Sequence, residues 1–265
     1  MTETASHVGA ANSPSAPDTR RWYALGLLCT AFFVVILDAS IVIVAIPSIE
    51  GDLAMAPGTS HGVISGYAVL FGGLLLLGGR AADRLGRRRT FMGGLALFAL
   101  SSLVCGFAPS SELLVLARMV QGAAAAVMAP SALSIIVATF PEGRERNKAL
   151  GAWGVTGGTA GALLGGLVTD VGWPWIFFVN VPVCVVLLVL CPMVLCNRRI
   201  DVRQGPFDLL GAASVTAALL VLIYAVVQAP ANRWAHPATW GALAGAACLG
   251  AIFWRVESSR VRSIR

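Results

Sequence analysis

Two ionisable side chains interrupt stretches that are otherwise apolar, and they are the first candidates for chemistry. Asp38 lies near the middle of the apolar segment 22–47, and Arg118 lies early in the apolar segment 113–139. A charged residue within a hydrophobic segment costs about 2.5–3.5 kcal/mol on insertion scales, so it usually marks a functional site. Asp38 is therefore a candidate for reversible protonation or cation binding. The alternative is a structural aspartate that stays hydrogen-bonded to a neighbouring helix.

Arg118 requires either a counter-charge or a water-filled cavity, and Asp38 is one candidate partner. Gln121 follows three residues later and could donate or accept a hydrogen bond in the same cavity. The segment beyond Arg118 is rich in glycine and alanine, which lets a neighbouring helix approach closely. The alternative for Arg118 is a side chain that extends to the lipid headgroups.

No other residues form a recognisable catalytic or metal site. The six cysteines lie in apolar stretches without the paired spacing of a zinc site, and the three histidines are scattered over predicted loops. No Ser/His pair or pair of carboxylates is apparent in the sequence either. We therefore expect no enzymatic activity, no metal and no cofactor.

The composition indicates a membrane protein. Hydrophobic residues make up 57% of the 265 and charged residues 12%, against about 25% charged residues in soluble domains. Since about 20 apolar residues cross a bilayer as a helix, the sequence predicts an all-α polytopic protein with about eight spans. The predicted spans are 22–47, 62–79, 91–107, 113–139, 149–169, 175–196, 208–228 and 238–254. Residues 1–21 lack apolar periodicity and are expected to be a disordered cytoplasmic tail.

The basic residues predict the orientation of these spans. If the N-terminus is cytoplasmic, every one of the 19 basic residues falls on the cytoplasmic side except Arg118 and Arg233. Short loops rich in arginine and lysine remain cytoplasmic, so both termini are expected inside a cell membrane. The predominance of arginine over lysine is typical of a GC-rich bacterial genome. Because the basic residues lie in predicted cytoplasmic loops, the formal net charge of +6 does not indicate nucleic-acid binding.

The most basic of these loops is the segment 79–89, which joins the second and third predicted spans. It combines two glycines and one aspartate with a run of arginines, a pattern whose main positions are Gly79, Asp83, Arg84, Gly86, Arg87 and Arg88. Its arginines place it at the cytoplasmic membrane face and set the orientation of the neighbouring helices. The family resemblance given below implies, in addition, that it is a gating loop.

The fifth predicted span is dense in glycine, with Gly154, Gly157, Gly161 and Gly165 at helical spacing. Each glycine costs a helix about 1 kcal/mol relative to alanine. The pattern therefore predicts a surface on which helices pack closely. In a transporter this surface would lie between halves that move, and simple small-residue packing would give the same pattern.

Together these segments resemble the fourteen-span drug:proton antiporter branch of the major facilitator superfamily. The similar segments are 37–47, 79–89, 118–126, 154–166 and 173–182. The segment 118–126 is similar to a fourth-helix motif that the family links to proton transfer, and 154–166 is similar to its antiporter motif. Ala162 stands where a proline is common in that motif, and Pro174 stands where an arginine is usual in the sixth-helix motif.

The resemblance implies a transporter of small amphiphilic compounds or drugs that exchanges them for protons by alternating access. It assigns residues 22–196 to an N-terminal six-helix lobe and residues 197–265 to two extra helices and a short cytoplasmic tail. A second lobe, with which Asp83 would make its gating contact, is not in the chain. The alternatives are a truncated, non-transporting remnant and a half-transporter that needs a separate second lobe. The direction of transport and the substrate stay open.

Overall fold

The computed structural model describes residues 19–55, 59–156, 172–195 and 209–228, with a few further positions between 240 and 248. All regular structure in these ranges is helical. The helices are α1 (Thr19–Asp52), α2 (Thr59–Leu85), α3 (Arg87–Gly106), α4 (Ser111–Thr139), α5 (Arg144–Val155), α7 (Trp175–Phe178), α8 (Asn180–Val194) and α9 (Leu209–Gln228). Among the described residues, α1 to α4 and the segment Trp175–Val194 are long and apolar enough to cross a membrane. The predicted class, an all-α polytopic membrane protein, is confirmed.

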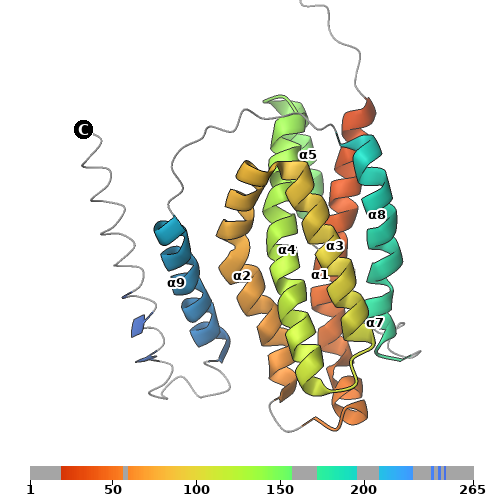
Figure 1. The fold of residues 1–265 in the computed structure, drawn as a ribbon. Coiled ribbons are helices and arrows are strands. Elements are labelled where there is room, and N and C mark those ends of the chain that lie inside the picture. Colours follow the sequence, from red (N-terminus) through yellow and green to blue (C-terminus); the bar gives the residue numbers. More distant parts are fainter. Residues whose placement is uncertain are drawn as a thin grey trace, which may run out of the picture.

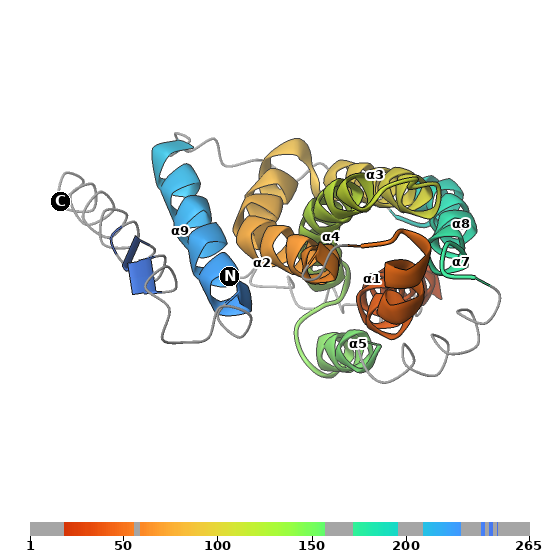
Figure 2. The ribbon, with the colours of Figure 1, turned by 90° about the horizontal axis from the view of Figure 1, so that it is seen from below.

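The helices stand side by side as a bundle (Figure 1). The central helix is α4, which packs against both α2 and α3, while α8 packs against α3 and α1 (Figure 2). On the outside of the bundle, α5 lies beside α1 and α9 lies beside α2. Residues on α1, α3, α4 and α8 can therefore meet in the interior.

Close backbone contact joins α2 to α4. A Cβ added at Gly122 would overlap the backbone carbonyl of Tyr67, and a Cβ added at Gly78 would overlap the backbone carbonyl of Ala126. Glycines at a helix crossing permit this approach because they have no side chain to separate the backbones. The crossing places the first half of α4, including Arg118, deep in the bundle.

The segment predicted as a loop at 79–89 is almost entirely helical. α2 continues to Leu85 and α3 begins at Arg87, so Gly86 alone lies between them, with a φ of 94°. Arginine and alanine are good helix formers, and only glycine adopts positive φ without strain. The reversal of the chain therefore needs a single residue, and the other residues of the predicted loop lie in the ends of α2 and α3.

The first helix is longer than predicted at both ends. It begins at Thr19, so residues 19–21 of the predicted disordered tail are helical, and it continues through Pro47 to Asp52. Contacts with distant residues stabilise both ends. Arg20 donates to the Met193 carbonyl at 2.6 Å near the start, and Trp173 Nε1 donates to Asp52 Oδ2 at 2.9 Å in the last turn. A membrane helix tolerates the proline because neighbouring groups compensate for its missing N–H.

The later predicted spans are described only in part. The predicted span 175–196 is divided at Val179 into α7 and α8, and the predicted span 208–228 corresponds to α9. The fifth predicted span begins in α5, but Gly157, Gly161 and Gly165 lie outside the described residues. A Cβ at Gly154 would meet no described atom within 4 Å. Residues 1–18 and most of the predicted span 238–254 also lie outside the described residues.

Candidate functional site

Asp38 and Arg118 form an ion pair in the core of the bundle. Arg118 Nη1 on α4 donates to Asp38 Oδ2 on α1 at 2.5 Å. The side chain of Asp38 is 0% exposed and that of Arg118 is 1% exposed. Arg118 therefore points into the protein rather than toward lipid headgroups, and the alternative of a side chain that extends to the membrane surface was wrong. A buried pair of this kind is tolerated only when further hydrogen bonds satisfy its remaining polar atoms.

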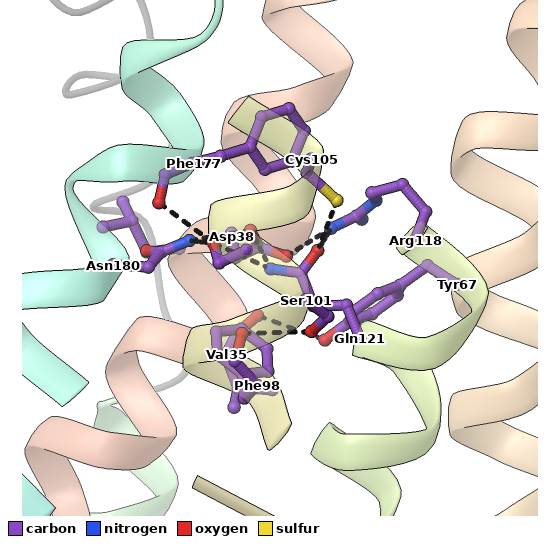
Figure 3. Close-up of polar contacts among 12 residues, drawn as sticks. Val35, Asp38, Tyr67, Phe98, Ser101, Cys105, Arg118, Gln121, Phe177 and Asn180 are labelled. Carbon is purple, nitrogen blue, oxygen red and sulfur yellow. Dashed lines mark hydrogen bonds and ion pairs between the residues drawn. The ribbon is translucent and has the colours of Figure 1, made fainter. Parts of the chain in front are cut away.

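Gln121 supplies two of those hydrogen bonds. Its Oε1 accepts from Arg118 Nη1 at 2.7 Å, and its Nε2 donates to Asp38 Oδ1 at 2.9 Å (Figure 3). Residues three positions apart lie on the same face of a helix, so α4 presents both side chains to Asp38. The structure thus brings together the three residues predicted as coupling and cavity residues.

Asn180, the first residue of α8, completes the set of donors around the carboxylate. Its Nδ2 donates to Asp38 Oδ1 at 2.9 Å and to Ser102 Oγ at 3.0 Å. Ser102 on α3 also accepts from Gln121 Nε2 at 3.2 Å and donates to the Phe177 carbonyl at 2.9 Å. Asp38 accordingly accepts hydrogen bonds from Arg118, Gln121 and Asn180, which come from two helices other than its own.

Aromatic rings flank the guanidinium of Arg118. Its Cζ lies 4.3 Å from the centroid of the Tyr67 ring and 5.8 Å from that of the Phe177 ring. A cation above an aromatic face gains about 2 kcal/mol when it is shielded from water. Arg118 Nε also donates to the Val63 carbonyl at 3.4 Å. The cation is therefore stabilised from α2 and α7 as well as by Asp38.

Three residues of this site were not predicted from the sequence. Asn180 is the only side chain with an amide in the otherwise apolar segment 175–196, and this isolation was the signal that could have identified it. Ser102 and Tyr67 give no such signal, because single serines and tyrosines are common in apolar helices. Their roles depend on which helices become neighbours.

The residues of the predicted gating loop lie elsewhere, at the arginine-rich end of the bundle. Arg87 Nη1 donates to the Ser134 carbonyl near the end of α4 at 3.0 Å, which ties the start of α3 to α4. Asp83 and Arg84 are exposed on the last turn of α2. The end of the bundle that holds Gly79, Gly86 and Arg88 is thus separate from the ion pair, which lies near the middle of α1 (Figure 1).

The described residues contain no group of three or more His, Cys, Asp or Glu side chains that could hold a metal ion. The site holds one buried carboxylate against one buried guanidinium, and the free energy of each buried charge depends strongly on its pairing with the other.

Comparison with curated proteins identifies relatives among antibiotic resistance and export proteins. The chain is 43% identical over 225 residues to the puromycin resistance protein of Streptomyces alboniger. The matched region covers 83% of this chain and 44% of the relative. It is 42% identical over 246 residues to a cephamycin export protein of Amycolatopsis lactamdurans, covering 91% of this chain and 50% of the relative. The chain spans about half the length of the curated relatives it matches.

Solved structures of transporters share the fold. A bacterial homologue of the human lysosomal transporter Spinster gives a TM-score of 0.55 at 18% identity, covering 88% of this chain and 60% of that one. A peptide transporter gives 0.59 at 17% identity, covering 82% and 48%. The sequence profile of the Major Facilitator Superfamily matches residues 28–258. The chain therefore belongs to the major facilitator superfamily, a family of multi-pass membrane transporters rather than enzymes.

Proposed function

We propose that this chain contains the N-terminal lobe of a proton-coupled exporter of small amphiphilic compounds. The names of its relatives, which include resistance and export proteins for puromycin, cephamycin and tetracenomycin C, support export of such compounds. The buried Asp38–Arg118 pair supports the coupling to protons and is the observation on which the proposal depends. The relatives are about twice as long as the matched region, so the proposed activity belongs to this lobe together with a second one.

In the proposed mechanism, Asp38 exchanges a proton with water while its pairing with Arg118 changes. When Asp38 is ionised, the pair is neutral and fully hydrogen-bonded. When Asp38 is protonated, Arg118 loses its counter-charge in a low-dielectric environment, where an unpaired charge is costly. A conformation in which water or an anion other than Asp38 contacts Arg118 is then favoured. Protonation shifts the population toward it because the two conformations then differ in free energy. Proton uptake would thereby favour one side of the alternating-access cycle.

The remaining site assignments fit the same proposal. The arginine-rich end faces the cytoplasm, as the positive-inside rule implies. Gly79, Asp83, Arg84, Gly86, Arg87 and Arg88 form the gating segment at that end. We assign residues 22–196 to the six-helix lobe and residues 197–265 to two further helices and a short cytoplasmic tail. Asp83 would contact the second lobe during gating.

Transport by inverted membrane vesicles tests the proposal. Vesicles would contain the chain alone or together with the C-terminal half of the puromycin resistance relative, and a proton gradient would drive uptake of a fluorescent lipophilic dye. We expect uptake in the two-lobe vesicles and its loss in Asp38→Asn, because an amide cannot exchange a proton. Val44→Leu, an exposed position on the same helix, is the matched control. Unchanged gradient-driven uptake in Asp38→Asn would exclude the coupling role.

A further inference from the structure

One buried polar atom beside Asp38 has no hydrogen-bond partner among the residues that the structure describes. Asn180 is 1% exposed and uses Nδ2 to donate to Asp38 and Ser102, but its Oδ1 is buried and accepts no hydrogen bond from the described residues. A buried carbonyl without a partner costs about 1–3 kcal/mol. Such an atom in an otherwise satisfied cluster requires an explanation.

The negative charge of Asp38 accounts for the orientation of this amide. If the amide were turned by half a turn, Asn180 Oδ1 would face the carboxylate oxygen, and two acceptors would oppose each other. With Nδ2 toward Asp38, the amide donates instead. Protonation of Asp38 reverses this requirement, because a carboxylic acid has an O–H that needs an acceptor.

The hydrogen bonds indicate which carboxylate oxygen receives the proton. Oδ2 holds the Arg118 guanidinium, whereas Oδ1 accepts only from the neutral amides of Gln121 and Asn180. The Gln121 oxygen already accepts from Arg118. The unpartnered Oδ1 of Asn180 is therefore the acceptor available to an O–H on Asp38 Oδ1.

The other titratable groups near Asp38 do not replace this acceptor. The groups that interact electrostatically with Asp38 are Arg118 on α4, Tyr67 on α2, Cys105 on α3 and Cys184 on α8. Arg118 carries only donors, and the Tyr67 hydroxyl is directed to the Val35 carbonyl at 3.4 Å. Proton uptake at Asp38 changes the combined charge of Asp38 and Arg118 from zero to +1. The protonated carboxyl group is then no longer stabilised by ion pairing and depends on a hydrogen bond.

We infer that Asn180 is a positioning residue whose side-chain amide turns by half a turn when Asp38 takes up a proton, so that Asn180 Oδ1 accepts the new O–H. The inference rests on the proposed function, which gives Asp38 a proton to exchange. A hydronium ion transfers its proton to Asp38 Oδ1 and becomes water, and no other covalent bond changes. The amide stabilises the ionised acid as a donor and the neutral acid as an acceptor.

The turn of the amide also affects the junction between α7 and α8. In its new orientation Asn180 no longer donates to Ser102 Oγ, and the Ser102 hydroxyl is then able to donate to Asn180 Oδ1 instead of the Phe177 carbonyl. Phe177 lies in α7 and Asn180 begins α8, with Val179 between the two helices. Proton uptake at Asp38 thus exchanges hydrogen bonds on both sides of this junction.

Infrared difference spectroscopy tests the switch on the full chain in lipid nanodiscs. Spectra would be recorded over a pH titration with and without ¹³C-labelled asparagine. The acid carbonyl band that is lost in Asp38→Ala belongs to Asp38, and the amide carbonyl band that is lost in Asn180→Leu belongs to Asn180. We expect the Asn180 band to shift to lower frequency in step with the appearance of the Asp38 acid band, because its carbonyl becomes an acceptor.

Controls separate this inference from the proposed function. Asn147→Leu changes an exposed asparagine and should leave both bands in place. If Asn180→Leu does not fold, labelled wild type compared with labelled Asp38→Ala still shows whether a pH-dependent amide band requires Asp38. An Asp38 acid band without any amide shift would overturn the switch and leave proton uptake intact. Absence of an Asp38 acid band at every pH would overturn both.

Discussion

The Asp38 carboxylate illustrates what allows a charge to remain in the core of a membrane protein. Its two oxygens accept one hydrogen bond from a cation and two from amides, so the charge is both paired and solvated by protein groups. Removing one member of such a pair is far more damaging than replacing both, because the remaining charge is buried without compensation. This difference can be measured as a difference in stability.

We predict that Arg118→Gln lowers the free energy of unfolding by about 3–5 kcal/mol, because it leaves Asp38 buried without its counter-charge. The double variant Asp38→Asn/Arg118→Gln should lose less, since neutral amides can still hydrogen-bond to each other. Thermal unfolding can be followed by the reaction of a fluorogenic maleimide with Cys105, Cys184 and Cys191, which are fully buried in the native state. If the double variant loses as much free energy of unfolding as Arg118→Gln and Asp38→Asn lose in sum, the two residues are not coupled.

The positions of the site residues could be predicted only in part from the sequence. Asp38, Arg118 and Gln121 stand out because polar residues are costly in apolar segments, whatever their neighbours. Ser102 and Tyr67 acquire their roles from the helices that pack beside them, and this packing is not visible in hydropathy. The orphaned oxygen of Asn180 is likewise a property of the packed bundle.

At the scale of helices, the close crossing of α2 and α4 holds Arg118 against Tyr67 and the Val63 carbonyl of α2. The two backbones touch at Gly122 and Gly78, and a side chain at either position would separate the helices. Van der Waals packing of small residues drives the association of membrane helices, because lipid supplies no hydrophobic force between them. The site is therefore sensitive to glycines that contact none of its charged groups.

We predict that Gly122→Ala destabilises the lobe by about 1–3 kcal/mol, the usual cost of overpacking. Gly93→Ala is the matched control: Gly93 lies within α3, and its added Cβ would meet no atom of the described residues within 4 Å. It should be neutral or stabilising by up to about 1 kcal/mol, since alanine favours the helix. Maleimide-monitored unfolding compares the two, and equal stability of both variants would contradict the close crossing.

Hydropathy predicted most spans but not the ends of the helices. An apolar segment of sufficient length identifies a crossing, which is why α1 to α4 coincide with predicted spans. The ends depend on other contacts. α1 passes Pro47 because Trp173 holds Asp52, and the basic segment around Gly86 is helical because one glycine suffices for the turn. Such long-range contacts leave no periodic pattern in the sequence.

At the scale of the whole molecule, the two ends of the bundle differ in charge. Arg20, Arg21, the junction of α2 and α3, and the start of α5 lie at one end, where Arg21 pairs with Glu145 at 3.1 Å (Figure 1). The opposite end holds Asp52 and Glu112. The fold thus gathers bases from distant parts of the sequence onto one face, which is the arrangement that the positive-inside rule places in the cytoplasm.

Labelling with a membrane-impermeant maleimide tests this orientation. Arg89→Cys and Glu112→Cys place thiols at exposed positions on opposite ends, and the unsubstituted chain measures the background from Cys248, which is exposed. We predict that Glu112→Cys is labelled in intact cells and Arg89→Cys only in inverted vesicles, because each thiol is accessible from one side of the bilayer. Labelling of Arg89→Cys in intact cells would place the arginine-rich end outside, and the proposed gating segment would then face the wrong compartment.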